Sequence, residues 1–131
     1  RDSLEPDLNT ALPNDPRDTC LPDQTVANIR ELAFGDRLTP EHDQMIQGWM
    51  TASPTGPNRI RAGAPAGWTI AHKTGTGANG TGNDIGMAIP LSGSPIVLAT
   101  YFTGAADATE DQRDAVIAEA TRRVFRALGR D

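Results

Sequence analysis

The sequence has 131 residues, about the length of one domain, and 37% of them are hydrophobic, enough for a modest core. The formal net charge of −5 excludes the basic surface on which nucleic-acid binding depends. The longest apolar run, residues 95–102, is too short to cross a bilayer, and no leader peptide is visible. We expect no nucleic-acid or membrane partner, and we expect a processed or truncated chain because it begins with Arg1.

Cysteine and histidine usage gives no sign of a metal site or a cofactor. Cys20 is the one cysteine of the sequence, so no internal disulfide can form, and the two histidines make no cluster with it. We predict an ordinary small side chain at Cys20 and an exposed His42. His72 is predicted to pack on the strand face opposite Lys73, and neither histidine is given a catalytic role.

Residues 1–22 predict a long loop. Prolines at positions 6, 13, 16 and 22 leave room for one helical turn only. Loops of this length in compact domains are usually functional or disordered. Leucines at positions 4, 8 and 12 recur every four residues and therefore favour an ordered, functional loop.

Residues 23–66 predict a helical segment. Apolar residues recur at helical spacing over residues 24–34 and stop at Gly35, and Thr39 followed by Pro40 is a typical helix start. A short further piece begins at Ile60 and ends near Pro65. The second helix is expected to bury Met45, Ile46, Trp49 and Met50.

Residues 67–103 change to a period of two, which predicts strands. One strand alternates from Trp68 to Lys73, Asn79-Gly80 suits a tight hairpin turn, and a second strand alternates over residues 85–91. Residues 96–102 are apolar at nearly every position, so a third strand buried on both faces is expected.

A capping box of Thr109 and Gln112 begins a C-terminal helix within residues 108–129. The expected fold is therefore α+β, with a three-stranded antiparallel sheet flanked by helices. A strand buried on both faces needs a layer on each side, which a larger protein provides more easily than this chain alone. The predicted apolar stripe of the last helix contains Val116, Ile117, Ala120, Val124, Phe125 and Leu128.

The stretch around Lys73, the only lysine of the sequence, allows three interpretations. A phosphate-binding loop needs glycines before the lysine, whereas here they follow it. A flexible hairpin beside a solvated lysine is the plain structural interpretation. The third is the Lys-Thr-Gly element of serine acyl-transfer enzymes that act on β-lactams and peptidoglycan peptides. There Lys73 has a catalytic role, since it orients a carboxylate and helps to shift a nearby proton, and Thr74 adds a hydroxyl donor. Gly75 admits the substrate backbone, and the Thr76 N–H stabilises an oxyanion.

A second motif, Glu5-Pro-Asp-Leu-Asn9, favours the third interpretation. Glu5 and Asn9 are four residues apart, so both side chains lie on one side of a helical turn. Together they can hold one water: the carboxylate removes its proton and the amide fixes its position, as hydrolysis of an acyl-enzyme requires. An exposed acid and a helix-capping asparagine are the structural alternative.

With these motifs the chain resembles class A serine β-lactamases over essentially its whole length. The resemblance implies the C-terminal portion of a single β-lactamase domain, from the Ω-loop at residues 1–22 to the C-terminal helix, with five strands in the complete fold. The segments that carry it, in the family's order, are Glu5–Asn9, Asn14–Thr19, Trp49–Met50, Arg59–Ala62, Pro65–Trp68, Lys73–Gly75 and Asn83–Ile85.

The resemblance also implies a set of roles. Glu5 is the base for deacylation and Asn9 helps to hold the water. Arg59, in preference to Arg61, is expected to bind the substrate carboxylate, because Gly82 stands where many members have an arginine for this purpose. The residues implied to line the substrate are Lys73, Thr74, Gly75 and Thr76.

The sequence departs from the family pattern in several places. It contains neither the nucleophile motif Ser-x-x-Lys nor the Ser-Asp-Asn loop, both of which precede the Ω-loop in the family. Ser3 stands where an arginine usually pairs with the Asp18 position, so Asp18 is expected to lose its partner and the loop to be looser. Cys20 stands where threonine is common.

We predict that the complete protein hydrolyses the amide bond of β-lactam antibiotics through an acyl-serine. The family implies a monomeric enzyme that is periplasmic or secreted. The chain alone is expected to be inactive and to need its N-terminal half. Two alternatives stay open. One is a penicillin-binding transpeptidase-like enzyme, against which the Glu5–Asn9 motif argues; the other is a non-catalytic fragment that complements another chain.

Overall fold

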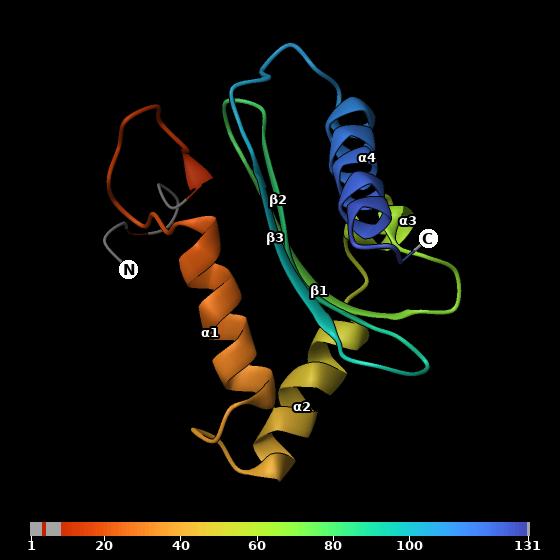
Figure 1. Ribbon diagram of the computed structural model, residues 1–131. Coiled ribbons are helices and arrows are strands. Elements are labelled where there is room, and N and C mark those ends of the chain that lie inside the picture. Colours follow the sequence, from red (N-terminus) through yellow and green to blue (C-terminus); the bar gives the residue numbers. More distant parts are fainter. Residues whose placement is uncertain (1–3, 5–8, 131) are drawn as a thin grey trace.

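The computed structural model describes residue 4 and residues 9–130. A three-stranded sheet stands between two helical layers, with α1 and α2 on one face and α3 and α4 on the other (Figure 1). This arrangement confirms the predicted α+β class. In chain order the elements are α1 (Pro22–Phe34), α2 (Pro40–Thr51), α3 (Ile60–Gly63), β1 (Thr69–Gly77), β2 (Thr81–Ile89), β3 (Ile96–Phe102) and α4 (Glu110–Ala127).

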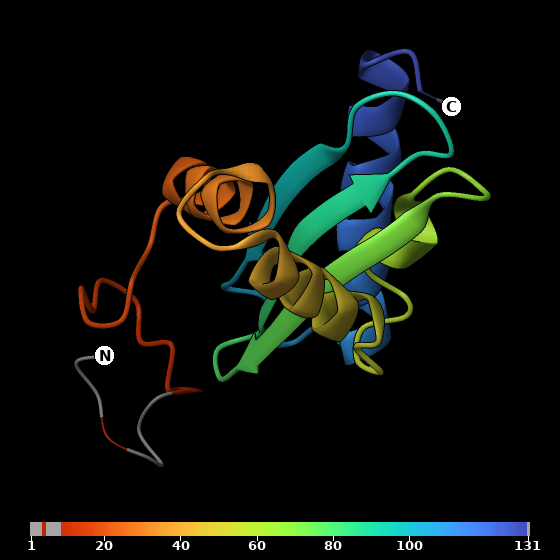
Figure 2. The same ribbon diagram turned by 90° about the horizontal axis from the view of Figure 1, so that it is seen from below.

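The sheet is an antiparallel meander in the order β1-β2-β3, as the period of two predicts (Figure 2). Lys73 of β1 lies opposite Ile85 of β2, which in turn lies opposite Ala99 of β3. The turn between β1 and β2 uses Asn79 and Gly80, whose φ angles are 53° and 65°. Both values fall in the left-handed region that asparagine and glycine tolerate best, so the predicted hairpin turn is confirmed.

The helix starts follow from local capping chemistry. The Thr39 hydroxyl accepts a hydrogen bond from the His42 N–H, and Thr109 forms the predicted capping box with Gln112. Helix α1 begins at Pro22, two residues before the predicted start, because proline suits the first helical turn. Among the described helices, none combines the length and the apolar character that spanning a bilayer requires.

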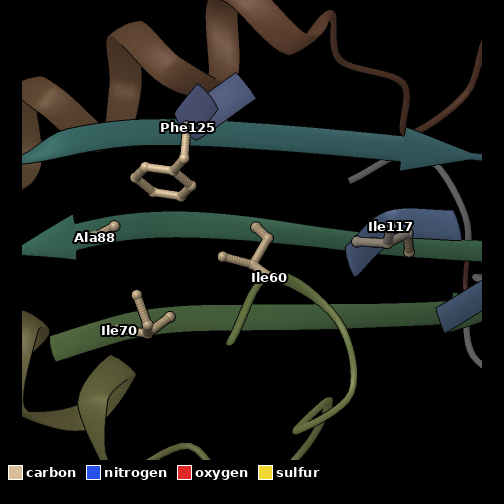
Figure 3. Close-up of a cluster of buried hydrophobic side chains, with 5 residues drawn as sticks. All are labelled: Ile60, Ile70, Ala88, Ile117 and Phe125. Atoms are coloured by element: carbon tan, nitrogen blue, oxygen red, sulfur yellow. The ribbon is translucent and has the colours of Figure 1, made fainter. Parts of the chain in front are cut away.

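The larger part of the core lies between the sheet and α4. Trp68 packs edge-on against Phe125, with ring centroids 5.2 Å apart and planes at 74°. The buried side chains of this core come from the sheet and from both helices of this layer, so α4 is fixed across the back of the sheet. The buried members are Ile60, Ile70, Ala88, Ile117 and Phe125 (Figure 3).

A smaller core lies on the other face of the sheet, beneath α1. Ile29 and Ala33 of α1 pack there with Ala71 of β1 and Met87 of β2. The Thr25 hydroxyl adds a polar tie, since it lies 2.5 Å from the Tyr101 hydroxyl of β3. Helix α1 is thereby joined to β1 and β3, the strands on either side of β2.

Two predictions of burial are wrong for this chain, and a third is right only for Ile117 and Phe125. None of the residues of α2 is buried, and Trp49 is 67% exposed, because the helix packs mainly against α1 and β1 among the described elements. Strand β3 is half-buried because it forms an edge of the sheet. On α4, Val116, Val124 and Leu128 are exposed, and the stripe facing the sheet is Asp114, Ile117, Ala118, Thr121 and Phe125.

Candidate functional site

The predicted substrate residues form an open row along β1, which is the other edge of the sheet. Lys73, Gly75 and Thr76 are exposed and Thr74 is half-buried. Because side chains alternate along a strand, Lys73 points away from the buried His72, as predicted. The Lys73 Nζ donates to the Thr74 carbonyl at 2.5 Å. The lysine ammonium therefore lies close to the strand backbone beside the threonine.

The turn before α3 packs against the middle of this row. The hydroxyls of Thr55 and Thr74 are 2.6 Å apart. Gly56 adopts a φ of +64°, and a Cβ added to it would lie 2.3 Å from the Thr74 methyl carbon. Only glycine allows the turn to approach the strand this closely.

Arg59 reaches the far end of the row from the α4 side of the sheet. The residue is only 3% exposed, and its Nε donates to an Asp114 carboxylate oxygen at 2.6 Å. Its Nη1 donates to the carbonyls of Gly75 and Asn83, both at 3.0 Å. Its Nη2 donates to the Thr76 hydroxyl, also at 3.0 Å. A planar fork of donors explains how one side chain bonds both strands and α4.

Two carboxylates of α4 balance the buried guanidinium charge. Asp114 is buried and makes the close ion pair, and Glu110 lies 3.6 Å from Nη2. Thr76 is the exposed end of this network. The Thr76 hydroxyl oxygen accepts a hydrogen bond from Arg59, so its own proton is free to be donated to an anion outside. The bond from Arg59 polarises the hydroxyl and makes it a stronger donor.

Arg61 serves the opposite end of the strand. Its Nη2 lies 3.4 Å from the Thr51 carbonyl and 3.5 Å from the Ile70 carbonyl, near the start of β1. Arg59, and not Arg61, therefore contacts the row that contains Gly75 and Thr76.

The described end of the predicted Ω-loop is attached to the same end of β1. The Asn9 carbonyl accepts from the Ala78 N–H at 2.9 Å. A Cβ added to Gly77 would lie 3.0 Å from the Asn9 oxygen, so the loop backbone packs directly on the strand end. Glu5 lies outside the described residues.

The Asn79 side chain is a clamp that sequence reasoning missed. Its Nδ2 donates to the carbonyls of Thr10 and Ala11, each at 3.0 Å. Asn79-Gly80 signals a turn in the sequence, but the same asparagine also holds residues 10 and 11 of the predicted Ω-loop. No local pattern indicates a contact across nearly 70 residues.

The loop between residues 10 and 21 contains several residues with positive φ angles and hydrogen bonds between residues close in sequence. Ala11, Asn14 and Asp18 all have positive φ angles, from 45° to 65°. Asp18 has a polar or electrostatic partner, although the sequence has serine, not arginine, at position 3. The Ser3 position lies outside the described residues.

A fully buried histidine–carboxylate pair lies behind the row. His72 Nδ1 is 2.9 and 3.0 Å from the two carboxylate oxygens of Asp84. The Ile60 N–H donates to the same carboxylate at 3.0 Å. Within the described residues no group of His, Cys, Asp and Glu side chains could hold a metal ion.

Comparisons with known proteins point in one direction. A model described as the β-lactamase enzyme family matches residues 3–128. The chain is 46% identical over 129 residues to Beta-lactamase AST-1 of Nocardia asteroides, and 42% identical over 127 residues to Beta-lactamase FAR-1 of Nocardia farcinica. These matches cover 98% and 97% of this chain but 41% and 40% of the relatives, so the chain spans less than half their length.

Solved structures agree with the sequence relatives. The class A β-lactamase of the last common ancestor of Gram-negative bacteria superposes with a TM-score of 0.93 at 47% identity, covering 97% of this chain and 48% of that one. The putative class A β-lactamase PenP from Rhodopseudomonas palustris superposes with a TM-score of 0.92 at 42% identity, covering 96% and 48%.

Proposed function

Since this chain belongs to the β-lactamase enzyme family, with class A enzymes as its relatives, we propose that it is the substrate-binding and water-activating portion of a serine β-lactamase. In the complete protein it hydrolyses the amide bond of β-lactam antibiotics through an acyl-serine. The complete enzyme is monomeric and is periplasmic or secreted, and the reaction needs no metal or cofactor.

One observation carries the proposal: two remote segments converge on the outer end of β1. The Asn9 backbone bonds to Ala78, and the Arg59 guanidinium bonds to Thr76. The open row of Lys73, Thr74 and Gly75 leads along the same strand to this end. A β-lactam bound along this edge would have its carboxylate near the cations and its carbonyl near the strand amides.

Each residue of the row has a chemical task in this proposal. Lys73 and the Thr74 hydroxyl orient the substrate carboxylate, and the open backbone at Gly75 lets the substrate lie against the strand. The Thr76 N–H stabilises the oxyanion that develops at the β-lactam carbonyl. Glu5 then removes a proton from the water held with Asn9, and that water hydrolyses the acyl-enzyme.

Arg59 supports substrate binding through Thr76. Its guanidinium is nearly enclosed and already donates four hydrogen bonds, so we assign it the task of orienting the Thr76 hydroxyl and supplying positive potential. The hydroxyl then donates to the substrate carboxylate. The sequence suggests that Arg59 binds the substrate carboxylate directly. We instead propose that it acts on the carboxylate through the Thr76 hydroxyl.

The nucleophile must come from another stretch of chain, because no Ser-x-x-Lys occurs here. Two surfaces can receive the N-terminal portion. One is the unpaired edge of β3, which offers backbone groups to a further strand. The other is the apolar face of α2, where Met45 and Trp49 are exposed. Large exposed apolar side chains of this kind are typical of surfaces that another segment covers.

Complementation tests the proposal. The isolated chain is expected to leave a chromogenic cephalosporin intact, and a mixture with a separately produced N-terminal portion of an AST-1-like enzyme is expected to hydrolyse it. A mixture in which the nucleophilic serine is replaced by alanine is the control and should be inactive. Turnover by the chain alone, or equal rates with and without the serine, would refute the proposed mechanism.

A further inference from the structure

The His72–Asp84 pair lies directly behind the proposed site and has no part in the chemistry described so far. Both side chains are 0% exposed. The ring is on the α3–α4 side of β1, and its Cε1 would be 3.5 Å from a Cβ added to Gly56. The imidazole therefore sits beneath the turn that leads to Arg59.

The hydrogen-bond geometry assigns the proton of His72 to Nδ1. Asp84 accepts from the Ile60 N–H through Oδ2, and its two oxygens lie 2.9 and 3.0 Å from Nδ1. Nε2 is enclosed and has no hydrogen-bond partner among the described residues. A buried acceptor without a partner is tolerated better than a buried donor without one, which favours the neutral ring with Nδ1–H directed at Asp84.

Asp84 thus joins the substrate strand to the Arg59 turn. One carboxylate holds the imidazole of β1 and the amide of Ile60, the residue that follows Arg59. The Arg59 guanidinium then spans from this turn to Thr76 with a hydrogen bond of 3.0 Å. Hydrogen bonds tolerate displacements of only a few tenths of an ångström, so the position of the turn decides whether the guanidinium reaches its acceptors.

We propose that His72 is a positioning residue for substrate binding: through Asp84 and the Ile60 amide it fixes the Arg59 turn and thereby the Thr76 hydroxyl. The inference rests on the proposed function of the Lys73–Thr76 row. His72 touches no reacting atom, so its loss should weaken binding of the substrate carboxylate and leave the chemical step largely intact.

Two variants of the complete enzyme distinguish the effect of the Nδ1 hydrogen-bond donor from the effect of the ring shape. His72→Phe keeps a ring of similar shape and removes the Nδ1 donor, whereas the amide nitrogen of His72→Asn replaces that donor. His72→Phe is expected to raise KM for a cephalosporin roughly tenfold and to change kcat less than about twofold, the effect of one lost hydrogen bond. His72→Asn is expected to restore most of the lost affinity. Should His72→Phe fail to fold, Asp84→Asn carries the same test with the same expected rise in KM.

A second readout does not depend on activity. The Arg59 Nε–H, hydrogen-bonded to Asp114, is expected to exchange slowly with solvent in the unmodified protein and faster in His72→Phe, as measured by NMR. An unchanged KM and exchange rate in His72→Phe would overturn the inference, as would an equal loss of kcat in the Phe and Asn variants. If the unmodified enzyme hydrolyses no β-lactam, the proposed function fails, and the exchange measurement still decides the positioning role.

Discussion

At the scale of single residues, a few polar contacts fix the positions of the charged and hydroxyl groups of the site. Arg59 is held by Asp114 of α4 and in turn holds the Thr76 hydroxyl. Lys73 remains exposed on the open edge of β1. The buried arginine uses its planar fork of donors inside the fold, whereas the exposed lysine presents a compact charge to the outside.

The Thr76 hydroxyl can be tested by substitution in the complete enzyme. Thr76→Val keeps the side-chain shape and removes the hydroxyl, so it is expected to raise KM for a cephalosporin by roughly tenfold, the effect of losing one hydrogen bond to a charged group. Thr76→Ser keeps the hydroxyl and is the matched control, with KM expected within about threefold of the original. Equal KM values for the two variants would show that the hydroxyl does not contact the substrate.

The predicted Ω-loop contains a carboxylate, Asp15, whose titration reports the local structure around it. Hydrogen bonds from the Arg17 side chain, and then from its backbone N–H, lower the pKa of Asp15 from the ordinary 3.8 to about 2. Since the folded pKa is the lower one, the pair stabilises the fold fully above pH 3.8 and loses this contribution as the pH falls toward 2.

NMR titration of the Asp15 carboxyl carbon checks this assignment. The protein is expected to give a midpoint near 2, and Arg17→Gln is expected to return the midpoint toward 3.8. Arg37→Gln, which alters an ion pair elsewhere on the surface, should leave it unchanged. A midpoint near 3.8 in the unmodified protein would mean that the Arg17 contact does not form in solution.

At the scale of elements, α3 and α4 form the support for the Arg59 turn, and Gly63 makes their contact possible. A Cβ added to Gly63 would lie 2.3 Å from the Ala118 carbonyl oxygen and 2.6 Å from the Thr121 Cβ. Gly63→Ala is therefore expected to lower the free energy of unfolding by about 1–3 kcal/mol through overpacking. Thermal unfolding of the complete protein measures the effect.

Gly48→Ala is the matched control, because no atom of the described residues, apart from the backbone of the same helix and the two adjacent residues, lies within 4 Å of the added Cβ. As an alanine inside a helix, it is expected to stabilise the protein by about 0.5–1 kcal/mol. If both substitutions shift the unfolding temperature equally, the close packing of α3 on α4 does not contribute to stability.

The sequence was sufficient to predict the elements whose signals are local. The alternation from Trp68 to Lys73, the Asn79-Gly80 turn and the Thr109 cap each depend on neighbouring residues, and each is confirmed. Burial on α2 and β3 was predicted wrongly. An apolar pattern indicates that a helix or strand face is covered in the complete protein, but it does not say which segment covers that face. The partners of that face need not belong to the same stretch of sequence.

The contacts around the candidate site could be predicted only in part. The Lys73–Thr76 row follows from a short motif on one strand. The Arg59–Asp114 ion pair, the Asn79 clamp and the His72–Asp84 pair each join positions at least twelve residues apart. Such contacts are fixed by strand register and helix packing, for which a single sequence has no direct signal.

At the scale of the whole molecule, the sheet formed by the described residues has open edges at both β1 and β3, and the two edges have different properties. The β1 edge presents the polar row proposed for substrate, whereas β3 is flanked by apolar side chains that suit a further strand. Substrate is therefore expected at the β1 edge and the N-terminal portion at the β3 edge.

The central claim is that this portion supplies the water-activating base to an acyl-serine formed on the other portion. Its most direct test is mass spectrometry of the complete enzyme carrying Glu5→Gln after mixing with a cephalosporin. The account predicts a stable adduct that adds the mass of the acyl group to the protein, while the unmodified enzyme turns over and shows no lasting adduct. Rapid turnover by Glu5→Gln would contradict the role of Glu5, and a lasting adduct on the unmodified enzyme would indicate a penicillin-binding transpeptidase-like protein instead.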